Sequence, residues 1–224
     1  MLQGLFPDAR VLVGAAANEA TLRGLHAPTV LHAATHVVFA EDPKVFLTPA
    51  AAQGQRGAQL GRPRSPVDAR ALPPESAAAL VLALPPAGTA TLDDGLVTAW
   101  EIMGMDLRGT RLVVLSGCSS GRGQARTGQG VYGLRRAFFI SGVETLVTSL
   151  WPVSDAQTPR LMADYYGGLK RGEGRAEALD RAMRHIRAQK PHPFYWAPFL
   201  VIGRKLLPSR LQTVISMCDG RTIA

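Results

Sequence analysis

The sequence predicts an α/β protein with a mostly parallel β-sheet and helices on both faces. Short apolar runs alternate along the chain with segments of helical periodicity, an order typical of parallel strands joined by helices. Several of these runs are apolar throughout, as expected for strands buried on both faces. The 224 residues are enough for one such domain with a substantial core.

The N-terminal elements begin with a strand over residues 10–14, which a glycine ends. Asn18 is a good helix-capping residue and predicts a short helix over residues 19–25. A second strand, residues 29–34, is apolar on both faces and leads into Thr35 and His36.

The middle of the chain contains a segment that is poor in large apolar side chains. Residues 50–78 are rich in Gly, Pro, Ala and Arg and cannot offset the entropy of ordering, so we expect a mobile loop within the domain. A strand over residues 79–84 follows, and Asp93 and Asp94 are expected to form a turn and cap the next helix. The predicted elements after them are a helix over 96–103 and a strand over 111–116.

The C-terminal half continues the alternation up to about residue 204. The predicted elements are a helix over 131–140, a strand over 142–150, helices over 156–169 and 175–189, and a strand over 196–203. Pro198 restricts that last strand to a sheet edge or a strand start. We expect residues 1–204 to form the domain and 205–224 to be a weakly ordered tail.

Composition argues against several classes of protein. The net charge of +8 and pI near 10.2 favour acidic partners, but no basic run carries interleaved aromatics, so we expect no specific nucleic-acid site. No membrane span or signal peptide is recognisable, which makes a cytoplasmic location the expectation. The two cysteines and five histidines have no zinc-ligand spacing, and we expect neither metal nor cofactor.

Two nucleophiles stand side by side in Gly117-Cys118-Ser119-Ser120-Gly121. The segment fits G-x-S-x-G, but a serine elbow leads directly into a helix, whereas a glycine-rich loop over 121–130 follows here. A catalytic thiol needs a base at the same sheet edge, and His36 ends one parallel strand while Cys118 follows another. An imidazole beside a thiol favours the nucleophilic thiolate, so we favour Cys118.

Two ordered motifs contain the histidine and the cysteine, namely His32-Ala33-Ala34-Thr35-His36 and Leu115-Ser116-Gly117-Cys118-Ser119-Ser120-Gly121. They resemble the H-x-A-T-H-G and L-S-A-C-x-T-G motifs of CHAT domains, which are caspase-like cysteine peptidases related to separases. The resemblance spans about residues 5–203 and includes residues 93–102, 107–110, 130–138, 149–155 and 195–199. It implies a caspase-like three-layer sandwich.

The resemblance also implies a cysteine peptidase mechanism acting on a protein or peptide substrate. His36 would be the general base and Cys118 the nucleophile, with the backbone N–H groups of Val37 and Cys118 as oxyanion donors. Asp155 occupies the place of an acidic residue that faces a basic P1 side chain in separases, and Trp151 would line the same pocket. His32 is expected to be structural.

The chain departs from the family pattern in three places. Val37 replaces a glycine and would be strained if the position needs a positive φ. Gly117 replaces an alanine and Ser119-Ser120 an x-Thr pair, and both changes are milder. The family's first strand and helix are missing, and that strand lies between the strands at 10–14 and 29–34. Those two strands could close up, or another chain could fill the gap. We expect the third possibility, that the sequence is an N-terminally incomplete piece of a longer protein with Met1 as an internal methionine.

Two hypotheses follow. The chain is either a cysteine endopeptidase, regulated by an activating partner or a fused helical-repeat region, or a catalytically degenerate CHAT domain that serves as a protein-interaction module. The intact pair of His36 and Cys118 favours the first, whereas Val37 and the missing strand favour the second.

Overall fold

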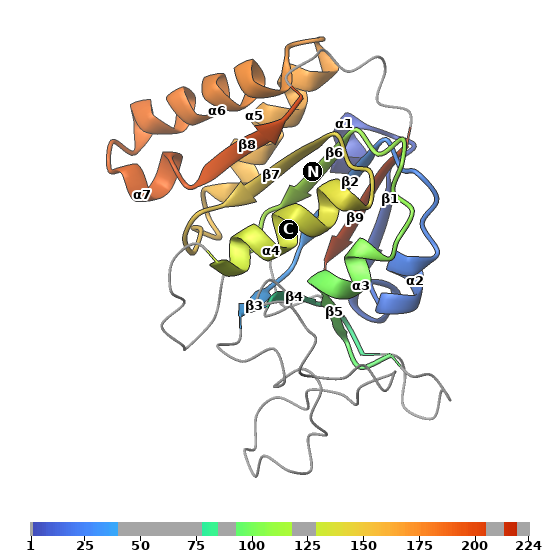
Figure 1. Ribbon diagram of the computed structural model, residues 1–224. Coiled ribbons are helices and arrows are strands. Elements are labelled where there is room, and N and C mark those ends of the chain that lie inside the picture. Colours follow the sequence, from blue (N-terminus) through green and yellow to red (C-terminus); the bar gives the residue numbers. More distant parts are fainter. Residues whose placement is uncertain (1, 40–77, 85–92, 118–128, 205–212, 219–224) are drawn as a thin grey trace.

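The computed structural model describes residues 2–39, 78–84, 93–117, 129–204 and 213–218. Its central feature is a six-stranded sheet of order β1-β9-β2-β6-β7-β8 (Figure 1). Five strands run parallel and β8 pairs antiparallel with β7. The strands are β1 (Arg10–Val13), β2 (Val30–Ala34), β6 (Leu112–Leu115), β7 (Thr145–Ser149), β8 (Phe199–Gly203) and β9 (Val214–Cys218). The predicted mostly parallel α/β fold is thus confirmed.

Helices cover both faces of this sheet, which makes three layers (Figure 1). The helices are α1 (Leu2–Leu5), α2 (Glu19–Arg23), α3 (Ala99–Met103), α4 (Gln129–Ile140), α5 (Thr158–Lys170), α6 (Arg175–Gln189) and α7 (Pro193–Trp196). Leu22, Ile102 and Phe138 pack on one face with Leu31 of β2. The helices α1, α5 and α6 pack on the other face with Val30. Alternate residues of a strand therefore face opposite layers, as the pleat requires.

A second, antiparallel sheet of order β3-β4-β5 lies beyond the carboxyl end of β2. It consists of β3 (Val37–Phe39), β4 (Ala78–Val81) and β5 (Leu96–Thr98). The helix predicted over 96–103 is therefore wrong in its first turn, because Leu96–Thr98 is a strand. Thr98 then caps α3, and its hydroxyl oxygen accepts the N–H of Glu101 at 3.2 Å.

The turn before β5 agrees with its sequence. Asp94 Oδ1 accepts the N–H of Leu96 at 2.8 Å, and Asp93 Oδ2 accepts the N–H of Ala20 in the first turn of α2 at 3.2 Å. The predicted turn is confirmed, but Asp93 caps α2 rather than the helix that follows it. Asn18 caps α2 as predicted, through its Oδ1 and the N–H of Thr21.

The C-terminal segment contradicts the expectation of a weakly ordered tail at residues 214–218. These residues form β9, which pairs parallel with both β1 and β2 and is buried at all five positions. The position between β1 and β2, where the resemblance implies another strand, is occupied by residues 214–218 of this chain, an arrangement different from the three possibilities considered above. The weak amphipathic pattern of the segment gave no signal, because a central strand is buried on both faces.

The remaining differences concern boundaries. Residues 193–196 form α7 ahead of β8, so the last strand begins at Phe199, after Pro198, and lies at the sheet edge. Residues 50–77 of the predicted mobile loop lie outside the described residues, and Ala78 already belongs to β4.

Candidate active site

The carboxyl ends of β2, β6 and β7 meet at one edge of the large sheet. The strand β2 ends at Ala34, and Thr35 and His36 then link it to β3 of the small sheet. The His36 side chain is half-buried, at the junction of the two sheets. The Thr35 hydroxyl donates to the carbonyl oxygen of Val81 in β4, and the N–H of Val81 donates to the carbonyl oxygen of His36 at 2.9 Å. The His36 backbone is therefore held by both sheets.

Gly117, the residue before Cys118, packs directly on the backbone of this link. A Cβ atom on Gly117 would overlap the carbonyl oxygen of Thr35, so only glycine fits without a backbone shift. The Gly117 carbonyl oxygen also accepts the hydroxyl of Ser149, at the end of β7, at 3.0 Å. Cys118 itself lies outside the described residues. What the structure brings together are the residues immediately before His36 and before Cys118.

The backbone of Val37 is extended, because Val37 is the first residue of β3. Among the described residues, only Ala27 combines a side chain with a positive φ, so the strain considered for Val37 does not arise. The Val81 N–H donates to the carbonyl oxygen of His36, and Val37, opposite Leu80, is therefore at a non-hydrogen-bonded position of the ladder. Its N–H points away from β4, toward the outer edge of the described small sheet.

His32 lies inside the protein on β2, on the face covered by α5. Its Nε2 is 2.6 Å from the hydroxyl oxygen of Ser116, and its ring packs against Tyr166 at 5.6 Å between centroids. Its Nδ1 is buried with no hydrogen-bond partner in the described part of the chain. Burial lowers the pKa of His32 to about 4. The side chain is 4% exposed, which agrees with the predicted structural role.

The pKa of His32 implies acid-sensitive stability. The folded state binds its proton only near pH 4, whereas the unfolded state binds it near pH 6.5. Above pH 6.5 the neutral His32 has no effect on the free energy of unfolding. As the pH falls from 6.5 to 4, protonation of the unfolded state lowers that free energy by up to about 3 kcal/mol. Urea unfolding at several pH values should show this loss, and His32→Gln should flatten the slope between pH 6.5 and 4.

The exposed His26 supplies the matched control for this measurement. His26→Gln should leave the slope as it is in the unchanged protein. An equal slope in the His32→Gln and unchanged proteins would show that other groups cause the acid sensitivity.

The two predicted substrate-pocket residues follow β7. Asp155 is exposed and lies in the turn that leads into α5. The indole of Trp151 is half-buried and donates from Nε1 to the carbonyl oxygen of Phe194 at 3.3 Å. Both residues follow the end of β7, where the Ser149 hydroxyl binds the Gly117 carbonyl oxygen. They therefore lie on the chain segment that leads away from the candidate site.

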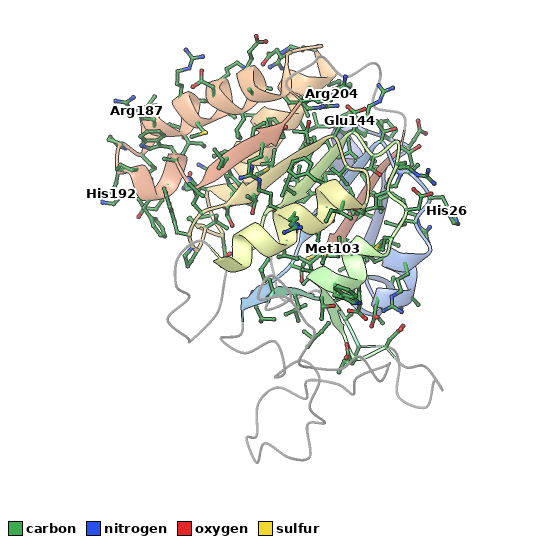
Figure 2. The ribbon with its side chains drawn as sticks, viewed as in Figure 1. His26, Met103, Glu144, Arg187, His192 and Arg204 are labelled. Atoms are coloured by element: carbon green, nitrogen blue, oxygen red, sulfur yellow. The ribbon has the colours of Figure 1, made fainter. Side chains whose placement is uncertain are left out.

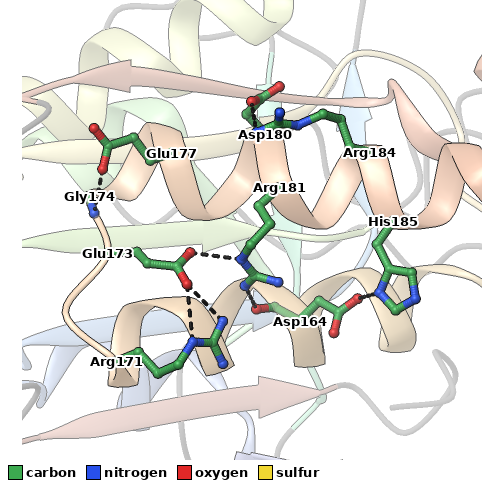
Figure 3. Close-up of polar contacts among 9 residues, drawn as sticks. All are labelled: Asp164, Arg171, Glu173, Gly174, Glu177, Asp180, Arg181, Arg184 and His185. Atoms are coloured by element: carbon green, nitrogen blue, oxygen red, sulfur yellow. Dashed lines mark hydrogen bonds and ion pairs between the residues drawn. The ribbon is translucent and has the colours of Figure 1, made fainter.

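Charged clusters elsewhere are structural. At the opposite end of the sheet, where Figure 2 labels Glu144 and Arg204, the buried Arg175 donates to the Thr145 hydroxyl at 2.7 Å and the Arg204 carbonyl oxygen at 3.2 Å. Figure 3 shows a second group between α5 and α6. Asp164 Oδ2 lies 2.5 Å from His185 Nδ1, and the backbone carbonyl oxygen of Asp164 accepts from Arg181 at 2.6 Å. Neither cluster includes a residue of the candidate site.

No group of three side chains suited to a metal ion occurs within the described ranges. Of the helices that the structure describes, none is long and apolar enough to cross a membrane.

Sequence reasoning missed two contributors to this geometry. Ser149 fixes the carbonyl before Cys118, and Ser116 pairs with His32. Each lies at the carboxyl end of a predicted apolar strand, and that position was the only signal available. Hydroxyls at such strand ends lie where parallel sheets place their sites.

Comparison with known proteins identifies the family. The model of the CHAT domain matches residues 1–204. Tetratricopeptide repeat protein 28 of Mus musculus is 30% identical over 198 residues, 86% of this chain and 8% of that protein. Its Homo sapiens counterpart is 35% identical over 114 residues, 50% of this chain and 4% of that protein. The chain thus spans less than a tenth of either relative. With its three layers and its sheet-edge histidine, the chain belongs to the CHAT domain family.

Proposed function

We propose that this chain is a cysteine endopeptidase domain in which His36 and Cys118 form the catalytic dyad. The observation that carries the proposal is the packing of Gly117 on the Thr35 carbonyl. It joins the two chain segments by backbone contact at the residues directly before the base and the nucleophile. Backbone contact of this kind positions side chains more firmly than loop contacts do.

In the proposed reaction, His36 takes the proton of the Cys118 thiol and the thiolate attacks the scissile carbonyl carbon. The N–H groups of Val37 and Cys118 hold the oxyanion, and the outward direction of the Val37 N–H suits this role. The imidazolium of His36 then gives its proton to the leaving amine. Water hydrolyses the thioester, with His36 again as the base.

The substrate side of the proposal rests on Asp155. An exposed carboxylate on the segment that leaves β7 favours a lysine or arginine side chain at P1. Trp151, tied to α7 through its indole N–H, would form a wall of the same pocket. A partner protein or a fused repeat region that regulates the activity would be a further part of this proposal.

The decisive experiment is labelling by a peptidyl electrophile with arginine at P1, at neutral pH. We expect rapid modification of Cys118, with the site identified by mass spectrometry of the peptides. Cys118→Ala should abolish the labelling. His36→Ala should slow it by roughly 10²-fold or more, because the base that favours the thiolate is gone.

The exposed His185 provides the matched control, since His185→Ala removes a histidine that lies on α6. That variant should be labelled like the unchanged protein. If Cys118 reacts no faster than free cysteine, or equally fast without His36, the peptidase proposal is wrong. An unchanged rate in Asp155→Ala with lysine, arginine and alanine probes would refute the P1 preference alone.

A second candidate function is a protein-interaction module without catalysis. Trp100 on α3 and Ile140 on α4 expose 48% and 54% of their surface, and their two helices pack together. Aromatic side chains such as Trp100 are enriched in protein–protein interfaces. This function predicts an unreactive Cys118 in a stably folded protein.

A further inference from the structure

The strand β9 occupies a slot in the middle of the sheet, between β1 and β2. Its pairing is parallel on both sides, with Ile215 opposite Arg10 and Leu31, and Cys218 opposite Val13 and Ala34. A strand in this position satisfies backbone donors and acceptors on two neighbours at once, and these groups are buried. The strand comes from the far end of the sequence, after the edge strand β8.

The slot selects a strand with a definite pattern. Ile215 and Met217 enter the apolar layer formed with α2, α3 and α4. Val214 enters the opposite layer. On that opposite side, Ser216 and Cys218 pair in register with His32 and Ala34. The His32 ring packs against Tyr166 there, and the residue paired with His32 is the small Ser216. The preceding residue, Thr213, is exposed and contributes its carbonyl oxygen to the N–H of Val30 at 3.0 Å.

The strand is attached to the fold differently from its neighbours. The strands β2, β6 and β7 are each preceded by a helix that packs on the sheet, α2, α3 and α4. The described residues on either side of β9 include no such helix, since β8 precedes it and Cys218 is the last described residue. Among the described residues, its release would break the pairings with β1 and β2 and the contacts of its own five side chains without unfolding a helix, as a local opening distinct from global unfolding.

We propose that the slot between β1 and β2 is a binding site for one parallel β-strand, and that the C-terminal strand β9 is its exchangeable resident. The recognised chemistry is an extended peptide with large apolar residues at the positions of 215 and 217 and small ones at 216 and 218. Its backbone supplies the affinity and these alternate side chains the specificity, as in other cases of strand addition.

Occupancy of the slot also controls the candidate site. Cys218 pairs with Ala34, which is followed by Thr35 and His36. Loss of β9 leaves β2 paired only with β6 up to the residue before this link, so Thr35 would be held against Gly117 from that side alone. This control of His36 rests on the proposed function, whereas strand exchange does not.

The test uses the full chain with a protease recognition sequence introduced within residues 205–212 and cut after folding. A fluorescent peptide with the sequence of residues 213–219 is added, and its uptake is followed by anisotropy and gel filtration. We expect uptake with release of the resident strand. In the uncut protein, the amides of 214–218 should exchange hydrogen faster than those of 112–115 in β6.

Two peptide variants with the same new side chain make the matched comparison. Ile215→Asp places a carboxylate in the apolar layer and should abolish uptake, whereas Thr213→Asp changes an exposed position and should be taken up normally. No uptake, together with equal protection of 214–218 and 112–115, would overturn the proposal. Equal uptake of both variants would also overturn it, because binding would then be non-specific.

The labelling of Cys118 separates this inference from the proposed function. With the slot emptied, modification of Cys118 should slow roughly tenfold or more, and the unchanged peptide should restore it. If the peptide is taken up while Cys118 stays unreactive in every state, the strand site stands and the peptidase proposal fails. If Cys118 reacts equally with the slot filled and emptied, occupancy does not control the site.

Discussion

Gly117→Ala should destabilise the protein by about 3 kcal/mol and suppress labelling of Cys118. The new methyl group would overlap a backbone atom, the carbonyl oxygen of Thr35, which no side-chain rotation can relieve. Either β2 and β6 move apart at their ends or the link that carries His36 shifts. The midpoint of urea unfolding and the rate of labelling report these two responses separately.

Gly4→Ala is the matched control, since a Cβ atom there meets nothing within 4 Å. We expect it to keep both stability and labelling. This comparison has particular interest because alanine is the residue that CHAT domains usually carry at the position of Gly117. If Gly117→Ala is as stable as Gly4→Ala, the close packing of Gly117 on Thr35 is not a feature of this protein.

Arg175→Ala should cost about 3–5 kcal/mol of unfolding free energy without any direct effect on the site. The Arg175 side chain is 2% exposed, and its guanidinium joins the start of β7 to the end of β8. Its removal leaves a cavity and takes the charged partner from Glu144. Thermal and urea unfolding measure the loss, and labelling of the folded fraction should keep its rate.

Two variants test the cause of that loss. Arg175→Met fills most of the cavity and should recover part of the stability, since apolar packing can replace a buried ion pair. Arg184→Ala removes an arginine whose partner, Asp180, is equally exposed, and should change stability by at most about 0.5 kcal/mol. A similar effect of Arg175→Ala and Arg184→Ala would refute a structural role for the buried guanidinium.

Most of the large sheet could be predicted from the sequence, because its strands are short apolar runs between helical segments. The small sheet could not. Residues 37–39 come shortly after β2 in the sequence. Only their antiparallel pairing with β4 shows that they form a distinct strand in another sheet. Leu96–Thr98 was read as the first turn of a helix because apolar residues continue into α3. Pairing partners distant in sequence decide both cases.

For the candidate site, the sequence predicted which residue types stand at the strand ends, and tertiary structure decided how they are held. The histidine and the cysteine each follow an apolar run in the sequence, and local pattern is enough to predict that they lie at one sheet edge. The backbone contact of Gly117 with Thr35 and the direction of the Val37 N–H depend on two sheets meeting, which no local pattern contains.

The order of the strands shows the same division most clearly. The sequence by itself determined the layers and the family, because periodicity and ordered motifs are local properties of the chain. Only the tertiary structure decided that residues 214–218 lie between β1 and β2. A strand buried on both faces carries no alternating pattern, and its place is set by backbone groups of two neighbours about 200 residues away, which must be paired once they are buried.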